Sequence, residues 1–186
     1  MVRLRAQHDA DVEALIALAR RAWRDVEASI DDLLGSPLDR LATPSWAAHH
    51  EAVVREACSA EETTVVVAED GQELVGFVAH RVHPPSDGMS AYGEVVVIAV
   101  DPGARNRGVG RTLLDRAVAD LRDRAVPVIM VETGGDEGHS PARALYESAG
   151  FTRLPVAQYW LAGTTDAGSS GPAGSSADIC QPSSRT

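Results

Sequence analysis

The stretch that decides the fold is EVVVIAVDPGARNRGVGRTLL, residues 94–114. Its first seven residues, 94–100, are an apolar, β-branched run with the length of a strand that is buried on both faces. The Asp-Pro-Gly turn at 101–103 ends that strand, because proline fixes φ and glycine tolerates a tight turn. From Val109 onward, apolar residues recur at helical spacing. The sequence therefore predicts a buried strand followed directly by an amphipathic helix.

The connection between this strand and helix reads RNRGVGRT and predicts an anion-binding site. Two glycines let a ligand approach the backbone, and first-turn N–H groups at the positive end of a helix have no partner within it. The dinucleotide fingerprint G-x-G-x-x-G is incomplete, and no Lys-Ser/Thr follows for a P-loop. A glycine-rich connection without a ligand is the alternative. The residues expected to bind phosphate are Arg105, Arg107, Gly108, Val109, Gly110, Arg111 and Thr112.

Composition and charge narrow the class of protein. With 186 residues, of which 44% are hydrophobic, the chain suits one globular domain. It contains no apolar run near the roughly 20 residues of a membrane span and no signal-peptide segment, so we expect a cytoplasmic protein without a membrane partner. The net charge of −10 argues against nucleic acid as a partner and is compatible with a cationic amine. Cys58 and Cys180 lack metal-binding spacing, so no metal is expected.

The remaining segments predict a single α+β domain over residues 1–162 and a disordered Gly/Ser/Pro-rich tail over 163–186. Three successive strands with short connections favour an antiparallel meander, whereas the strand–helix–strand unit after it favours parallel pairing. Residues 25–44 are predicted to be irregular, because glycine and proline interrupt them. We expect strands at 2–5, 63–69, 74–83, 94–100, 126–132, 151–154 and 158–161, and helices at about 12–23, 45–57, 109–124 and 140–149.

A second motif lies near the end of this domain. Residues 142–151 read ARALYESAGF, which resembles the signature A-x-x-L-Y-x-x-x-G-F of the GNAT superfamily of N-acetyltransferases. The R-x-x-G-x-G at 105–110, after a strand ending in AVDP, resembles the other signature of that family. Two motifs in the correct order are more specific than either alone, and the order of elements is similar over residues 2–161.

The resemblance implies a fold and an activity. The fold is the α/β (α+β) GNAT fold, a mixed central sheet of six to seven strands with about four helices, splayed in the middle to hold acetyl-CoA. The activity is acetyl-CoA-dependent transfer of an acetyl group to a primary amine, by direct attack in a ternary complex. A non-catalytic CoA-binding sensor or interaction module on the same fold, or transfer of a different acyl group, are the alternatives.

The resemblance also implies roles for individual residues. Ile98, Ala99 and Val100 would lie along the pantetheine arm, and the Ile98 N–H would polarise the thioester carbonyl. Tyr146 would be the general acid that protonates the departing thiolate, and its alternative role is that of a core aromatic. His139 stands where the family often has an asparagine that contacts the coenzyme. A histidine there could donate a hydrogen bond, take part in acid–base chemistry, or be a solvated loop side chain.

Glu94 is the candidate general base, because the attacking amine must be neutral. A glutamate that opens an apolar strand would be partly desolvated, which would raise its pKa. A solvent-exposed cap of the strand, His80, His83 or a base acting through water are the alternatives. Loop carboxylates such as Asp136 are expected to be solvated, with attraction of a cation as the alternative.

The acetyl acceptor is expected to be a small-molecule amine or a peptide or protein amine. Its site should involve residues 25–45, the loop at 84–90 and the last hairpin, where the sequence pattern is weakest. The sequence leaves the choice of acceptor and the oligomeric state open, with a homodimer as one alternative.

Overall fold

The computed structural model describes residues 2–86 and 88–163, without the side chains of Ser36 and Pro37. The disordered tail predicted from the sequence lies, from residue 164 on, outside the described residues. Within them, five strands form one mixed sheet in chain order. The first four strands pair antiparallel and the fifth pairs parallel with the fourth. The strands are β1 (Arg3–Ala6), β2 (Thr63–Asp70), β3 (Glu73–His83), β4 (Tyr92–Val100) and β5 (Ile129–Val131).

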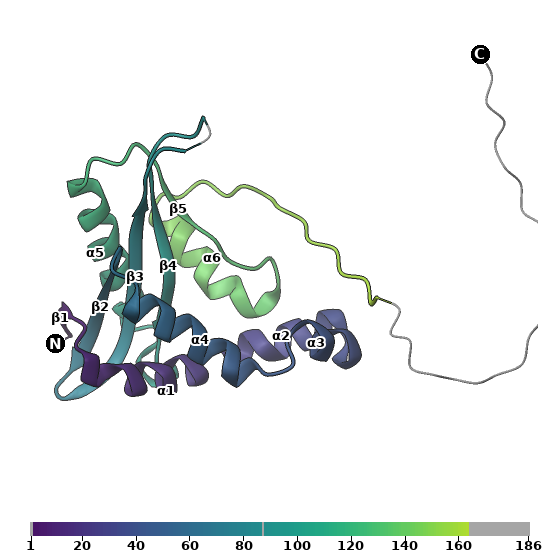
Figure 1. Cartoon of the computed structure of the whole chain (residues 1–186). Coiled ribbons are helices and arrows are strands. Elements are labelled where there is room, and N and C mark those ends of the chain that lie inside the picture. Colours follow the sequence, from purple (N-terminus) through teal and green to yellow (C-terminus); the bar gives the residue numbers. More distant parts are fainter. Residues whose placement is uncertain (1, 87, 164–186) are drawn as a thin grey trace, which may run out of the picture.

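Helices cover both faces of this sheet (Figure 1). Helices α1 and α4 pack on one face, α5 and α6 pack on the other, and α2 and α3 project beyond the sheet. None of the helices in the described part of the chain is long and apolar enough to cross a membrane. The helices are α1 (Val12–Ala22), α2 (Arg24–Leu34), α3 (Ser36–Ala42), α4 (Trp46–Ser59), α5 (Val109–Asp123) and α6 (Ser140–Ser148), with short 3₁₀ helices η1 (Asp9–Asp11), η2 (Pro102–Ala104) and η3 (Glu137–His139).

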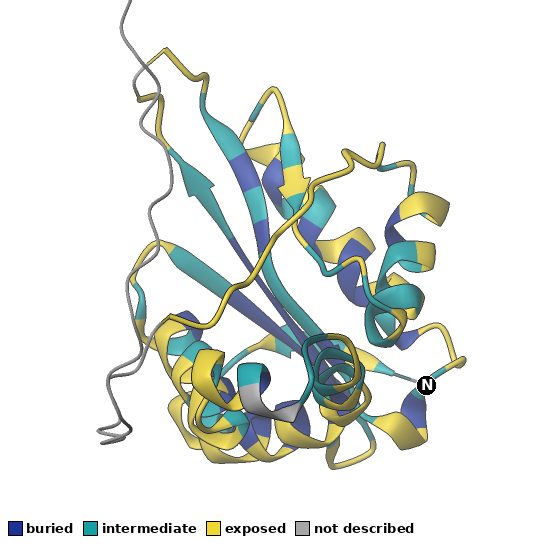
Figure 2. Ribbon diagram, turned by 90° about the vertical axis from the view of Figure 1, so that its right-hand side faces the viewer, coloured by how far each residue is buried: buried dark blue, intermediate teal, exposed yellow. Residues whose placement is uncertain are grey.

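Alternation along the strands divides the core into two clusters, one on each face of the sheet. Leu15 and Phe77 belong to the cluster under α1 and α4, whereas Val78, Leu113 and Leu121 belong to the cluster under α5 and α6. In Figure 2 the buried residues follow the middle of the sheet and the inner sides of the helices. Each such side chain contributes roughly 1.5–3 kcal/mol on burial, so the sheet and its two helix layers stabilise each other.

Two predicted segments differ from the structure. Residues 25–44 are mostly helical, because Gly35 (φ 75°) and the proline in the first turn of α3 mark a boundary between two helices. The expected final hairpin is absent: residues 152–163 form no strand, and Leu154 and Tyr159 are exposed. The described chain thus has five strands and six α-helices, where we predicted six to seven strands and about four helices.

The short strand β5 explains why the predicted final hairpin is missing. Strand β5 spans only three residues, because Pro127 cannot donate to a ladder and pairing begins after it. It therefore offers a short edge for a further strand, and Pro155 interrupts the segment that would add to it.

The predicted splay in the sheet lies between β4 and β5. The two strands pair only at Gly93–Val95 and Ile129–Val131, and β4 continues to Val100 without β5 beside it. The register with β3 leaves Val96 as an extra residue, which is a β-bulge. A bulge bends its strand, so this one lies at the point where β4 diverges from β5.

Candidate active site

Beyond the bulge, β4 has an edge that no strand of the described chain pairs. The Asp101 N–H donates to the Val75 carbonyl at 2.9 Å, which fixes the alternation of the antiparallel β3–β4 ladder. Alternate residues of β4 bond to β3, so Ala99, two residues before Asp101, also bonds to β3. Ile98 and Val100 direct their N–H and C=O groups to the opposite side, where β5 no longer pairs with β4. Ile98 and Val100 are thus available to a ligand, and Ala99, predicted with them, is not.

The start of α5 presents a second group of free backbone donors. Gly108 precedes the helix in the left-handed conformation (φ 79°), and no side chain among residues 2–86 and 88–163 caps the first turn. The first helical bond runs from the Thr112 N–H to the Gly108 carbonyl at 3.0 Å, and the Thr112 hydroxyl donates to the same carbonyl. The N–H groups of Val109, Gly110 and Arg111 therefore have no acceptor within the helix and lie at its positive end.

The three arginines of this connection differ in what they can reach. Arg105 donates to the Asp25 carboxylate at 2.7 Å and ties the loop to α2. Arg107 pairs with Asp70 at 2.5 Å, and Arg111 pairs with an aspartate one turn later on α5. The Arg107 and Arg111 pairs are exposed, and an exposed pair contributes at most about 1 kcal/mol to stability. An anionic ligand could therefore replace the carboxylate partners of these two guanidinium groups.

Glu94 lies in a polar cluster on the sheet face that carries α1 and α4. Arg81 Nε donates to Glu94 Oε2 at 2.8 Å, His83 Nε2 lies 2.6 Å from the same oxygen, and the His83 ring stacks on Tyr92 at 4.4 Å. Partial burial raises the pKa of Glu94, but the hydrogen bonds from His83 and Arg81 outweigh it and hold the pKa below its usual value. The raised pKa that we expected is therefore wrong. Arg81 and His83 alternate on β3 opposite Glu94, a signal that only the strand register reveals.

Two other predicted proton carriers lie on the opposite face of the sheet. His80 is completely buried against α5, where its Nε2 is 3.3 Å from an Asp120 oxygen, so it cannot meet a substrate. Tyr146 belongs to the core cluster, with its ring centroid 6.1 Å from that of Phe151. Burial raises the pKa of Tyr146 to about 12, so its hydroxyl keeps its proton at neutral pH.

His139 ends η3, directly before α6, and is paired. Its Nδ1 lies 2.5 Å from Asp136 Oδ2. The Asp136 side chain is only 7% exposed, so the expected solvated carboxylate is instead a buried partner of the histidine. In residues 2–86 and 88–163, no group of three or more His, Cys, Asp or Glu side chains is arranged to hold a metal ion.

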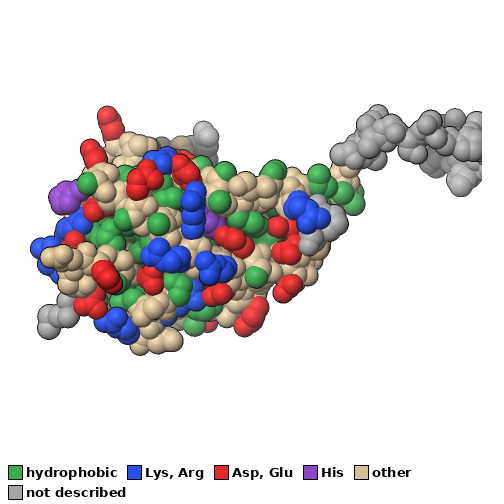
Figure 3. All heavy atoms as spheres, turned by 90° about the horizontal axis from the view of Figure 1, so that it is seen from below, with side chains coloured by type: hydrophobic (Ala, Val, Ile, Leu, Met, Phe, Trp, Pro, Cys, Tyr) green, Lys and Arg blue, Asp and Glu red, His purple; other side chains and the backbone are tan. Residues whose placement is uncertain are grey.

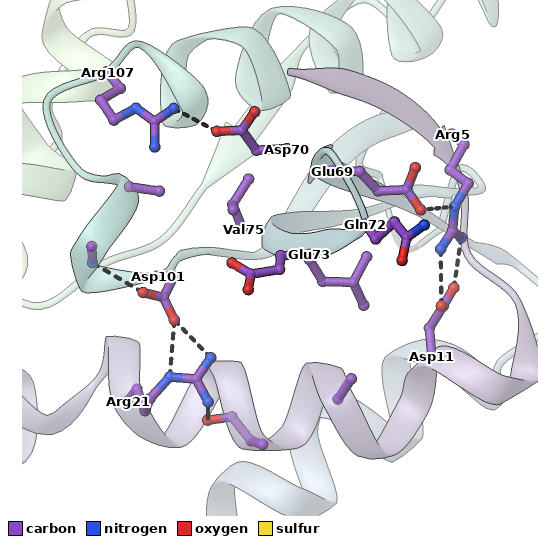
Figure 4. A pocket seen from close by; sticks show the side chains of 15 residues that line it. Arg5, Asp11, Arg21, Glu69, Asp70, Gln72, Glu73, Val75, Asp101 and Arg107 are labelled. Carbon is purple, nitrogen blue, oxygen red and sulfur yellow. Dashed lines mark hydrogen bonds and ion pairs between the residues drawn. The ribbon is translucent and has the colours of Figure 1, made fainter. Parts of the chain in front are cut away.

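A hollow of about 710 Å³ lies between α1, β1, the β2–β3 hairpin and the segment that follows β4, including Arg107. Most of its charged side chains pair with one another (Figure 4): Arg21 with Asp101, Arg107 with Asp70, and Arg5 with acids on η1 and β2. Seen from below (Figure 3), arginine and acidic side chains are interspersed over the surface. Because Ile98 and Val100 do not line this hollow, we do not place the candidate site there.

Solved acetyltransferases share this fold. The structure of AAC(6')-Iy with the bisubstrate analog CoA-S-monomethyl-acetylneamine matches with a TM-score of 0.60 and 16% identity, over 88% of this chain and 99% of that one. A predicted acetyltransferase from Clostridium acetobutylicum, solved with acetyl-CoA, matches with a TM-score of 0.58 and 16% identity, over 86% of this chain and 95% of that one. At such identities, these matches show the fold alone.

Residues 26–151 match the model of the Acetyltransferase (GNAT) family, and the chain belongs to that family. Mycothiol acetyltransferase of Thermomonospora curvata is 43% identical over 90 residues, which are 48% of this chain and 28% of that protein. The mycothiol acetyltransferase of Beutenbergia cavernae is 49% identical over 73 residues, 39% of this chain and 24% of that protein. The chain thus spans less than a third of the length of these curated relatives.

Proposed function

We propose that this protein transfers an acetyl group from acetyl-CoA to a primary amine by direct attack in a ternary complex. The observation that carries the proposal is the meeting of two unpaired stretches of backbone, the edge of β4 and the first turn of α5. Gly110 of that turn lies against β4, since a side chain built on it would be 3.6 Å from the Val100 side chain. The first turn of α5 suits an anion, which the pyrophosphate of the coenzyme would supply. The edge of β4 suits amide groups, which the pantetheine arm would supply.

The start of α5 is proposed to hold the pyrophosphate. The N–H groups of Val109, Gly110 and Arg111 would donate to phosphate oxygens, with Arg107 and Arg111 turning to them from their exposed carboxylate partners. Arg105 would keep its bonds to the Asp25 carboxylate on α2 and to the Ala22 carbonyl at the end of α1, and would hold the loop in place. Family membership and the solved relatives that hold CoA or acetyl-CoA support this assignment.

The edge of β4 is proposed to act in the chemical step. The coenzyme supplies the acetyl thioester, whose carbonyl oxygen gains negative charge as the amine attacks. The Ile98 N–H would stabilise that charge from a fixed position, and losing one such donor typically costs about 10²–10³ in rate. Val100 would hold the pantetheine amides, so that the carbonyl meets the Ile98 donor.

Two side chains are proposed to handle protons at the reaction centre. Tyr146, protonated at neutral pH, would donate its hydroxyl proton to the departing thiolate. Glu94 is one candidate for the base that accepts the amine proton. Glu94→Gln should then lower the rate most at low pH, where deprotonation of the amine limits, and an unchanged pH–rate profile would remove Glu94 from the mechanism.

The acceptor is proposed to be a small molecule with a primary amine. The relatives named mycothiol acetyltransferase and the neamine-based ligand of AAC(6')-Iy support this class. The substrate panel should therefore contain the acceptor of mycothiol acetyltransferases, an aminoglycoside such as neamine, simple alkyl amines and a peptide with a free N-terminus.

The test combines calorimetry with acetyl-CoA and a thiol-release assay over this panel. Binding together with thiol release for at least one amine is the expected result. Binding without release for any amine would contradict the transferase and favour the non-catalytic CoA-binding module. Absence of binding would contradict both.

A further inference from the structure

Asp136 and His139 form a hydrogen-bonded pair in the loop that follows β5. Burial raises the pKa of Asp136, but the hydrogen bonds with His139 and Ser29, together with the charge of His139, outweigh this and bring the pKa below its usual value. An ionised carboxylate only accepts hydrogen bonds, so the proton of the 2.5 Å contact belongs to His139 Nδ1. In the neutral imidazole the lone pair is then on His139 Nε2, and no group in the described part of the chain bonds to that nitrogen.

The surrounding loop keeps this pair in place. Arg143, one turn into α6, donates to the Gly134 carbonyl at 2.8 Å and to the Asp136 carbonyl at 2.5 Å. A side chain at Gly134 would collide with Asp136 Oδ2 and His139 Nδ1, so glycine leaves the space that the pair occupies. The carboxylate is buried, whereas the His139 side chain keeps 24% of its surface exposed. One partner is fixed and the other remains accessible.

Helix α2 links the loop of this pair to the loop that follows β4. Gly138 packs on the start of α2, where its N–H donates to Ser29 Oγ at 3.0 Å and a built side chain would lie 2.8 Å from the Asp25 carbonyl oxygen. The Asp25 carboxylate in turn holds Arg105, in the loop after β4. Asp25 is thus touched by both chain segments that follow the diverging strands. The loop of His139 and the loop that leads to the proposed anion site therefore meet at the same end of α2.

We infer that His139 is the general base of the transfer and that Asp136 is its positioning residue, an inference that rests on the proposed function. As the acceptor nitrogen forms its bond to the acetyl carbon, Nε2 takes one proton from that nitrogen. The carbon–sulfur bond breaks and the thiolate receives a proton from Tyr146. The imidazolium then returns its proton to solvent, and the Tyr146 phenolate takes one proton back from solvent. The Asp136 carboxylate orients the ring and stabilises the imidazolium that forms.

The same geometry makes Glu94 the weaker base. Its Oε2 already accepts from Arg81 and His83, and both donors favour the ionised carboxylate over the protonated one. A base that binds its proton weakly gives little driving force for proton transfer near neutral pH. The charged groups around His139 are Asp136 and Glu137 on its own loop, Arg143 on α6 and Asp25 on α2.

The test compares His139→Asn, Asp136→Asn and a matched control, Glu137→Gln, in the full chain. Glu137 lies in the same loop and bonds to Ser140, so its variant removes a neighbouring carboxylate without touching the pair. His139→Asn keeps a hydrogen-bonding group at this position and should lower kcat by about 10²–10⁴-fold with little change in the KM for acetyl-CoA. Glu137→Gln should behave as wild type.

The pH–rate profile of Asp136→Asn distinguishes a role in catalysis from a merely structural role. Without the carboxylate the imidazolium is less stable, so the acid limb of the pH–rate profile should shift to lower pH while the plateau falls. A structural defect would lower the rate equally at every pH. Nitrogen-15 NMR should show the Nδ1–H tautomer for His139 in the wild-type protein, with its signal assigned by its loss in His139→Asn.

Failure of this inference differs from failure of the proposed function. If wild-type protein releases no thiol with any amine, the transferase proposal and the base assignment fall together. If wild-type protein is active but both variants keep its rate and pH profile, or if His139 is the Nε2–H tautomer, only the His139 assignment is overturned. If the pH–rate profile loses its acid limb in Glu94→Gln but not in His139→Asn or Asp136→Asn, Glu94 is the general base.

Discussion

Lowering the pH from 7 to about 4.5 should destabilise this protein through His50, a histidine that the proposed chemistry does not use. His50 is buried in α4, 3% exposed, with its ring centroid 4.7 Å from that of Trp23 and 5.8 Å from that of Trp46. Burial between these rings disfavours the charged imidazolium. The folded protein therefore holds His50 in its neutral form.

The charges around His50 set the size of the effect. Burial is the main cause that lowers the pKa of His50 from 6.5 to about 4, and His49 and Arg20 add to it. Glu27 Oε1 lies 3.2 Å from His50 Nδ1 and opposes the effect by attracting the proton. Burial and the neighbouring Asp39 raise the pKa of Glu27, although Arg24 opposes them, so Glu27 loses its charge early on acidification.

The sign follows from the direction of the shift. Because the folded-state pKa lies below the unfolded value, the unfolded chain binds this proton first as the pH falls. The stabilising contribution is complete above about pH 6.5 and is lost between about 6.5 and 4. At about 1.4 kcal/mol for each pH unit, the full loss is roughly 3.5 kcal/mol. Stopping at pH 4.5 leaves part of it unmeasured and Glu27 attracts the proton, so we expect about 2 kcal/mol.

Urea unfolding, followed by tryptophan fluorescence between pH 7.5 and 4.5, measures this contribution. The difference in unfolding free energy between wild type and His50→Gln should shrink by about 2 kcal/mol over this range, because glutamine does not titrate. His49→Gln, which changes the exposed neighbouring histidine, should leave the pH dependence nearly unchanged. A difference between wild type and His50→Gln that stays constant with pH would refute the reasoning.

Three further substitutions, one of them with a matched control variant, test the core and the proposed site. Gly76→Ala places a Cβ 2.9 Å from the Ala99 carbonyl oxygen, so urea unfolding should show a loss of about 1–3 kcal/mol. Tyr146→Phe keeps the buried ring, so stability should hardly change, whereas steady-state kcat should fall by roughly 10²-fold because the hydroxyl is lost. An unchanged kcat would show that Tyr146 acts only as a core aromatic. Arg107→Gln should weaken acetyl-CoA binding by about tenfold in calorimetry, whereas Asp70→Asn, which releases Arg107, should not weaken it.

The strand, turn and helix of residues 94–124 could be read from the sequence, because their signals are local. A β-branched run, an Asp-Pro-Gly turn and a helical apolar stripe each act within a few residues. The structure confirms these elements, with α5 beginning at Val109 as predicted. Residues 25–44 were predicted wrongly, since their glycine and prolines can end one helix and begin the next as well as form a loop.

Side-chain partners were beyond reach of the sequence because they depend on contacts between distant residues. Glu94 meets Arg81 and His83 only through the β3–β4 register, which reverses the expected direction of its pKa shift. Asp136 becomes buried only because η3 packs against α2, more than a hundred residues away in the chain.

The sequence by itself determined the buried strand, the uncapped glycine-rich helix start and the motif around Tyr146, because each is encoded in consecutive residues whose backbone preferences suffice. The tertiary structure alone decided which backbone groups remain free. The bulge at Val96 and the short pairing of β5 turn Ile98 and Val100 toward an unpaired edge and Ala99 toward β3. It also decided which side chains are ionised, since burial and distant charged partners set each pKa.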